Sequence, residues 1–119
     1  MKKNIVYFIL IFSFLSCEKS NNISDSIDTG NTVTTQGLDF IPDLIYCELG
    51  DTVFFTLTPS HNAVQVSETT YQNNEGTPLD GGFNIDYGQS GYFVPENIGT
   101  YYYVCQPHLP GMKARIIVQ

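Results

Sequence analysis

The sequence has few basic residues and few histidines. Only five Lys and Arg stand against twelve Asp and Glu, which gives a formal net charge of −7 at pH 7. A chain this acidic is disfavoured at nucleic acids and at anionic membrane surfaces, and it attracts cationic partners over long range. We therefore exclude nucleic-acid binding, although acidity also simply keeps exported proteins soluble.

The chain also lacks an apolar run of the roughly 20 residues that a membrane-spanning helix needs. The shorter run Ile5–Leu15 follows two lysines and leads to Cys17, which is the arrangement of a secretory signal. Its end, Phe14–Cys17, resembles the lipobox of bacterial lipoproteins, with Phe14 where Leu is usual. We expect residues 1–16 to be a lipoprotein signal peptide and Cys17 to carry lipid; the alternative is ordinary cleavage nearby and a released protein.

Loss of this leader removes two lysines and no acidic residue, so three basic residues remain against twelve acidic ones and the formal charge becomes −9. Residues 17–37 are polar with scattered single apolar residues, and no period of 2 or 3.6 emerges. Such a segment cannot bury enough surface to offset its ordering entropy. We predict a lipidated flexible tether over residues 17–37 and one domain over residues 38–119. Lipidation would place that domain on the periplasmic or cell-surface side of a bacterial membrane. We expect the protein to be a monomer.

A helical spacing of apolar residues is absent from the mature chain, and β-branched and aromatic residues separated by turns take its place. We expect a strand at 44–48, a turn at 49–51 and the returning strand at 52–57. Further strands are expected at 92–94, 100–105 and 112–118. The period-2 rule puts one set of side chains on the core face: Ile45, Cys47, Val53, Phe55, Leu57, Tyr101, Tyr103, Cys105, Met112, Ala114, Ile116 and Val118. Short strands at these intervals predict an all-β fold, a two-sheet antiparallel Greek-key sandwich.

Residues 67–91 form a long region rich in Gly, Asn, Thr and Asp. Loops of this length without structure are uncommon in compact domains and are often functional. The region is expected either to cover one side of a functional site or to be an excursion without chemical consequence, and the sequence favours neither.

The scarce histidines point to a metal. Cys105, His108 and Met112 fall within eight positions, and the only other histidine is His61. Copper is the ion whose sites combine a thiolate, two imidazoles and a weak axial thioether, and such sites carry electrons. Zinc also accepts two histidines and a cysteine, so the identity of the metal depends partly on Met112.

Several segments of the sequence form a recognisable set: Gly50-Asp-Thr-Val53, His61-Asn62 with Val64 after it, Gly81-Gly-Phe83, and Gly99-Thr-Tyr-Tyr-Tyr-Val-Cys-Gln-Pro-His108 followed by Gly111-Met-Lys113. Through them the chain resembles the cupredoxins, the small blue-copper proteins such as plastocyanin, pseudoazurin and amicyanin. The resemblance covers about residues 38–119. It implies one type 1 copper with His61, Cys105 and His108 as equatorial ligands and Met112 as the axial ligand. Asn62 would stiffen the site through hydrogen bonds to the Cys105 segment.

One departure from these relatives concerns the axial ligand. Three residues separate His108 from Met112, whereas plastocyanin and pseudoazurin have four and amicyanin has two. The distance of Met112 from copper is therefore not fixed by the resemblance.

Two plainer interpretations remain for the cysteines. Cys105 might pair with Cys47 in a disulfide, because exported domains occupy an oxidising compartment; this would leave the spacing of His108 and Met112 unexplained. A buried free thiol that acts as a small hydrophobe is the other interpretation of Cys47.

The resemblance implies an electron carrier and not an enzyme. Electrons would pass through His108, whose edge reaches the surface in the family, within an apolar ring that includes Leu109 and Pro110. The partners would be a redox donor and acceptor, a cytochrome or a copper oxidase or reductase. The alternatives are a copper-binding protein for delivery, storage or protection, and a metal-free adhesion-type sandwich.

Overall fold

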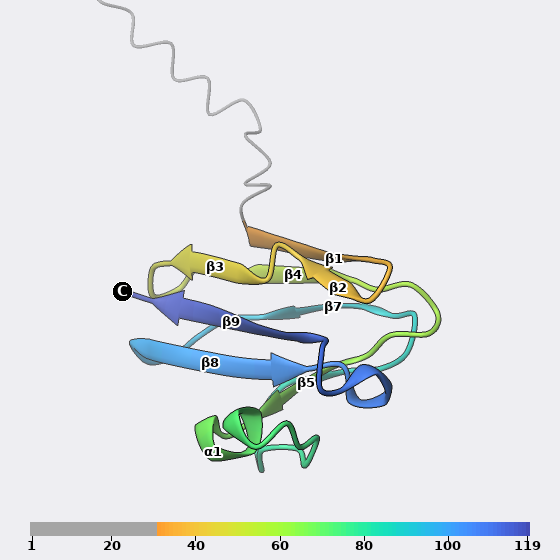
Figure 1. The fold of residues 1–119 in the computed structure, drawn as a ribbon. Helices are drawn as coiled ribbons and strands as arrows, with labels where there is room; N and C mark the ends of the chain where they lie inside the picture. The colour runs from red at the N-terminus through yellow and green to blue at the C-terminus, as the bar shows by residue number, and fades with distance from the viewer. Residues whose placement is uncertain (1–30) are drawn as a thin grey trace, which may run out of the picture.

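The protein is represented by a computed structural model that describes residues 31–119. Our predictions for the signal peptide, for Cys17 and for residues 17–30 lie outside the described residues. Within the described part the strands form two sheets, and Figure 1 shows them stacked as layers. One sheet has the order β2 (Asp39–Ile41), β1 (Thr32–Gln36), β4 (Val53–Thr56), β7 (Ser90–Phe93). The other has the order β3 (Leu44–Cys47), β9 (Lys113–Val118), β8 (Gly99–Val104), β5 (Ala63–Val66), β6 (Asn84–Ile85).

The predicted two-sheet β-sandwich is confirmed, but its sheets are mixed and not purely antiparallel. β1 pairs parallel to β4, and β3 pairs parallel to β9. The remaining pairs are antiparallel, among them β8 with β9 over six residue pairs. Alternation of apolar residues specifies which face of a strand is buried, but it carries no information about the direction of the neighbouring strand.

The boundary predicted between tether and domain at residue 37 is wrong. β1 occupies Thr32–Gln36, where Val33 is fully buried while both edges of the strand pair, with β2 and with β4. A strand with one valine, three threonines and one glutamine shows no apolar period of 2, so composition alone does not separate it from a tether. Its ladders on both sides, together with the buried Val33 side chain, fix it in the fold.

The predicted hairpin over residues 44–57 is also wrong as a pairing, although both strands exist. β3 belongs to one sheet and β4 to the other, and the turn between them crosses from sheet to sheet. Gly50 has a φ of +86° in this turn, a conformation that favours glycine. The local sequence indicates a reversal of the chain but not which sheet the second strand joins.

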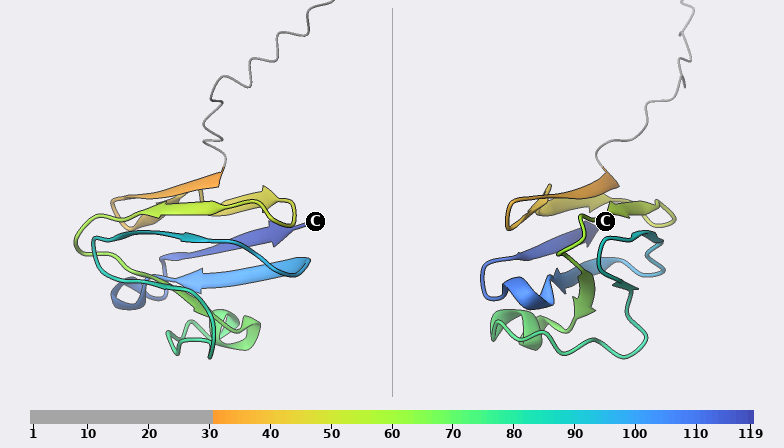
Figure 2. Two further views of the ribbon diagram at one scale, coloured as in Figure 1. Left: turned by 180° about the vertical axis from the view of Figure 1, so that it is seen from behind. Right: turned by 90° about the vertical axis from the view of Figure 1, so that its right-hand side faces the viewer.

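The prediction that no helix follows the signal is corrected by two short helical turns. Helix α1 (Glu68–Gln72) begins after Ser67, whose side-chain oxygen accepts a hydrogen bond from the backbone N–H of Thr70 at 3.1 Å. The 3₁₀ turn η2 (Gln106–His108) carries a proline in its first positions. Neither is long enough to show a helical period. The predicted long region 67–91 thus contains α1, β6 and the start of β7, and Figure 2 shows α1 on the opposite side of the molecule from β1.

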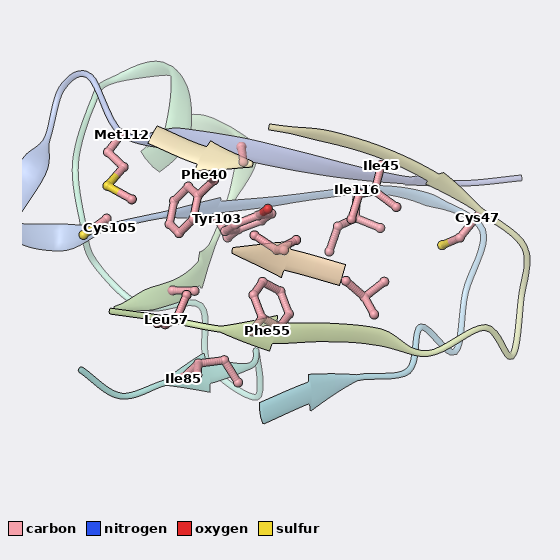
Figure 3. Packing of buried hydrophobic residues seen from close by; sticks show 14 of the residues in the cluster. Phe40, Ile45, Cys47, Phe55, Leu57, Ile85, Tyr103, Cys105, Met112 and Ile116 are labelled. Carbon is pink, nitrogen blue, oxygen red and sulfur yellow. The ribbon is translucent and has the colours of Figure 1, made fainter. Parts of the chain in front are cut away.

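Most of the predicted core face is buried in the sandwich (Figure 3). Tyr103 lies at its centre and packs edge-on against Phe40, with ring centroids 4.9 Å apart, and against Phe55 at 5.5 Å. Cys105 and Met112 lie at one end of this core, and Cys47 lies at the other (Figure 3). Among residues 31–119, no helix has the length and apolar character needed to span a membrane.

Candidate metal centre

The alternation of β8 carries Cys105 into the core. Tyr103 and Cys105 are both buried and two residues apart, so the strand delivers the thiol to the end of the sandwich beside the packed aromatic residues. The chain then turns through η2, where His108 is half-buried. Met112 ends the turn just before β9 and is 1% exposed. The loop between two paired strands therefore presents three donor groups to one end of the molecule.

Three backbone hydrogen bonds hold this ligand loop in shape. The N–H of His108 donates to the carbonyl oxygen of Cys105 at 3.2 Å, and the N–H of Met112 donates to that of His108 at 3.1 Å. The N–H of Cys105 donates to the carbonyl oxygen of Met112 at 3.0 Å. The backbones of the three predicted ligands are thus hydrogen-bonded to one another, so that their side chains are positioned by one rigid turn.

His61 reaches the same place from a different loop. It follows β4, and its N–H donates to the carbonyl oxygen of Thr58 at 3.0 Å while its own carbonyl accepts from the N–H of Gly88 at 3.2 Å. The side chain is 4% exposed. Its imidazole is also hydrogen-bonded to the backbone of Gly37, which orients the ring. Such a bond from a ligand imidazole to the backbone is a usual support of a metal site.

The three side chains converge on one point. The Nδ1 atoms of His61 and His108 are 3.1 Å apart, and the Sγ atom of Cys105 lies 3.7 Å from the first and 3.3 Å from the second. In a trigonal site with donors about 2.0–2.3 Å from the ion, neighbouring donors lie roughly 3.5 Å apart. The triangle of one sulfur and two nitrogens therefore fits a metal ion, and His₂Cys with a nearby methionine is the donor set of type 1 copper.

Burial also shifts the pKa values of two of these groups, the Cys105 thiol and the His61 imidazole. The pKa of the Cys105 thiol is raised by burial, an effect that backbone hydrogen bonds from Asn62 and His108 partly oppose. Burial lowers the pKa of His61, and the neighbouring His108 lowers it further. A neutral His61 imidazole is the form that binds a metal, whereas the thiol must lose its proton when the metal binds.

Asn62 lies where the resemblance implies, between the two ligand loops. Its Oδ1 atom accepts a hydrogen bond from the backbone N–H of Gln106 at 2.9 Å. Its Nδ2 atom donates to the Oε1 atom of Gln106 at 3.0 Å. These bonds join the residue after His61 to the residue after Cys105, and they fix the separation of the two loops.

Gln106 was not identified from the sequence as part of the site. Its side chain also connects the long region 67–91 to the ligand loop. Its Nε2 atom donates to the carbonyl oxygen of Gly76 at 2.7 Å. Part of the region 67–91 therefore packs against the ligand loop, which favours the first of the two interpretations we gave for it. An isolated glutamine carries no signal in a sequence, because its role depends on a carbonyl group thirty residues away.

The surface around His108 contains both residues of the predicted apolar ring. Leu109 is half-buried and Pro110 is exposed. Leu38, which the sequence did not single out, is 61% exposed and follows Gly37, whose backbone bonds to the His61 ring. Leu38 thus adds a third apolar residue to the end of the molecule that carries His61 and His108. Cys47, in contrast, is buried at the other end of the core, and no disulfide joins it to Cys105.

Comparison with protein families gives one match. The family model for copper-binding proteins of the plastocyanin/azurin family matches residues 27–119. No curated protein matches the sequence. The matched range begins before β1, in agreement with the place of that strand in the fold.

Solved structures of small copper proteins share the fold. A pseudoazurin from Hyphomicrobium denitrificans is 27% identical with a TM-score of 0.59, over 74% of this chain and 73% of its own. A pseudoazurin from a Sinorhizobium species is 24% identical with a TM-score of 0.59, over 74% of this chain and 72% of its own. An amicyanin from Paracoccus versutus is 21% identical with a TM-score of 0.54, over 74% of this chain and 79% of its own. With this fold and donor set, His61, Cys105, His108 and Met112 form a type 1 copper site.

Proposed function

The chain belongs to the plastocyanin/azurin family of copper-binding proteins, and on this basis we propose that it carries single electrons between redox partners outside the cytoplasm. The observation that carries the proposal is the convergence of the Cys105, His61 and His108 donor atoms within 3.1–3.7 Å of one another. Bound copper supplies the one-electron couple of such a site. The positions of ligand atoms held by a β-sandwich change little between two redox states, and an electron carrier needs this property.

Hydrogen bonds within the protein hold the four ligand residues in fixed positions. The turn bonds among Cys105, His108 and Met112 fix three ligands, and the Asn62–Gln106 pair fixes the fourth relative to them. Burial of Cys105 and Met112 excludes water from the sulfur donors. We propose no substrate turnover, because no acid-base pair lies beside the site within the described residues.

His108 is the proposed route for the electron. It is the more exposed of the two histidines, while His61 is buried. Leu38, Leu109 and Pro110 lie at the same end and provide an apolar surface on which a partner docks. Interfaces of electron-transfer partners are small and transient, so a few residues of this kind are sufficient.

The partners proposed are a redox donor and acceptor, such as a cytochrome or a copper oxidase or reductase. Lipid on Cys17 would hold the mature chain at a bacterial membrane, so that one tethered monomer meets both partners with a raised effective concentration. The mature charge of −9, from three basic and twelve acidic residues, favours partners with basic surfaces.

Voltammetry of the copper-loaded protein tests the proposal. A reversible one-electron wave together with an intense blue oxidised form supports the carrier. A colourless protein that transfers Cu(I) to an acceptor would instead support the delivery function. Labelling with a radioactive fatty acid in a bacterial host, with a Cys17→Ser control, tests the lipid anchor separately.

A further inference from the structure

Gln106 has a contact that ligand positioning does not require. Its backbone N–H and its Oε1 atom both bond to Asn62, which already links the two ligand loops. Its Nε2 atom turns outward to the carbonyl oxygen of Gly76, at 2.7 Å the shortest of the three bonds. One side chain thus connects the ligand loop to a third loop that supplies no ligand.

The third loop makes few hydrogen bonds between its two flanks. The N–H of Glu75 donates to Thr70 at 3.0 Å and the N–H of Leu79 donates to Gln65 at 2.8 Å, so both flanks are held. Within the described residues, the bond from Gln106 is the only hydrogen bond made by residues 76–78. Without it, no hydrogen bond would hold residues 76–78 between these two flanks.

Packing places the segment beside the electron route. A Cβ atom at Gly76 would lie 3.2 Å from Cγ of Gln106 and 3.3 Å from Cδ1 of Leu109. The absence of a side chain therefore lets the backbone of Gly76 lie directly against Leu109, the residue after His108. Thr77 and Pro78 are exposed and directly follow Gly76, the residue that lies against Leu109.

The charges around the segment indicate what it would contact. Residues 76–78 are uncharged, while Glu75 precedes them and Asp80 follows shortly after. A complementary surface would be uncharged at its centre and basic at its edge. A basic redox protein offers such a surface, whereas a small anion would be repelled by Glu75 and Asp80.

We propose that residues 76–78 are part of the surface on which a basic redox protein docks, and that Gln106 holds them there beside Leu109. This inference rests on the proposed carrier function. Gln106 is a positioning residue in this account: it is not a copper ligand, and it acts by ordering the segment that the partner meets.

Three variants separate the contacts of Gln106. Gln106→Met keeps the length of the side chain and loses every side-chain hydrogen bond. Gln106→Glu keeps the acceptor for Asn62 and loses the donor to Gly76. Gln119→Glu adds the same charge at the exposed C-terminal residue, at the other end of β9, and serves as the control for charge.

The first measurement is the order of the segment. Backbone ¹⁵N order parameters of Gly76 and Thr77, recorded on the Cu(I) protein and on the metal-free protein, are expected to fall from about 0.85 to below about 0.6 in both Gln106 variants. The Gln119→Glu control should retain the values of the parent protein. Unchanged order parameters in Gln106→Met would refute the role of Gln106.

The second measurement is electron transfer to two oxidants. One electron passes from the Cu(I) protein to ferric cytochrome, which becomes ferrous as the copper becomes Cu(II). With a basic c-type cytochrome, we expect the electron-transfer rate of Gln106→Met to be at least fivefold lower than that of the parent protein. The rate of Gln106→Glu should be at least fivefold lower than that of the charge control Gln119→Glu. With the small complex hexaammineruthenium(III), which needs no docking area, each Gln106 variant should stay within twofold of its reference.

The outcomes distinguish the two proposals. A disordered segment with an unchanged cytochrome rate would remove residues 76–78 from the docking surface. An equal loss with both oxidants would assign the effect to the copper site instead. If the parent protein transfers no electron to either oxidant, the carrier function fails and the docking claim with it, while the order parameters still decide whether Gln106 holds the segment.

Discussion

The Nδ1 atoms of His61 and His108 lie 3.1 Å apart although 47 positions separate the two residues in the sequence. So short a distance between two imidazole nitrogens from different loops, with the buried Cys105 thiol 3.3 Å from the His108 nitrogen, has no role in a hydrophobic core. It is explained by an ion that all three side chains bind, and the predictions below follow from that arrangement.

Replacing Met112 with Leu should raise the reduction potential. Met112 is buried and its backbone bonds to both Cys105 and His108, so its side chain has little freedom to leave the site. The thioether donates weakly to copper, and Cu(II) gains more from that donation than Cu(I). We expect a shift of about 59 mV, a tenfold change in the one-electron equilibrium. Voltammetry measures it, and an unchanged potential would show that Met112 is not an axial ligand.

Replacing Tyr103 with Phe should stabilise the protein. The Tyr103 hydroxyl is fully buried, and no hydrogen-bond partner for it lies within the described part of the chain. Burial raises the pKa of this phenol far above its usual range, so it stays neutral. Removal of an unsatisfied buried hydroxyl is worth about 1 kcal/mol. Urea unfolding of the metal-free protein gives the change, and a loss of stability would indicate an ordered water or another partner.

The stability of the metal-free protein should fall as the pH drops below the ordinary pKa of histidine. Burial, and then the charge of His108, lowers the pKa of His61 in the fold. In the acidic range the unfolded chain therefore binds a proton at this position that the folded chain does not, so stability rises with pH and levels off above about pH 6.5.

Urea unfolding between pH 5 and pH 8 measures this slope. His61→Asn is the matched variant, because it removes the titrating ring and leaves the other groups in place. We expect a shallower profile for the variant. Parallel profiles for the two proteins would mean that His61 is not shielded from protonation.

Charge should control the encounter with small redox probes. Nine of the acidic residues but only Lys113 and Arg115 among the cations lie in the described domain. Oxidation of the Cu(I) protein by a cation such as hexaammineruthenium(III) should slow a few-fold as salt rises from about 10 to 200 mM, and oxidation by ferricyanide should accelerate. Two flat profiles would contradict electrostatic steering.

The sequence was most informative where a strand alternates. Val53 and Phe55 in β4, and Ala114, Ile116 and Val118 in β9, are buried as the period of 2 predicts. Each of these assignments depends only on the direction in which a side chain points from its own strand. The metal ligands were equally predictable from the sequence, because four residues of three rare types, His, Cys and Met, fall at spacings that few other structures explain.

The sequence was least informative where contacts between distant segments determine the structure. β1 is held by ladders on both sides and not by its composition. β3 and β4 follow one another, yet they belong to different sheets. Gln106 gains its role from the carbonyl oxygen of Gly76. None of these relationships leaves a local pattern in the sequence.

The most direct test of the account is the visible spectrum of the mature protein after addition of Cu(II), beside that of the Cys105→Ser variant. The parent protein should bind one copper per chain and become intensely blue. The variant should stay folded, because the loop backbone bonds remain, and should lack the blue colour. A colourless parent protein, or a variant as blue as the parent, would contradict the assignment of Cys105 as the copper thiolate.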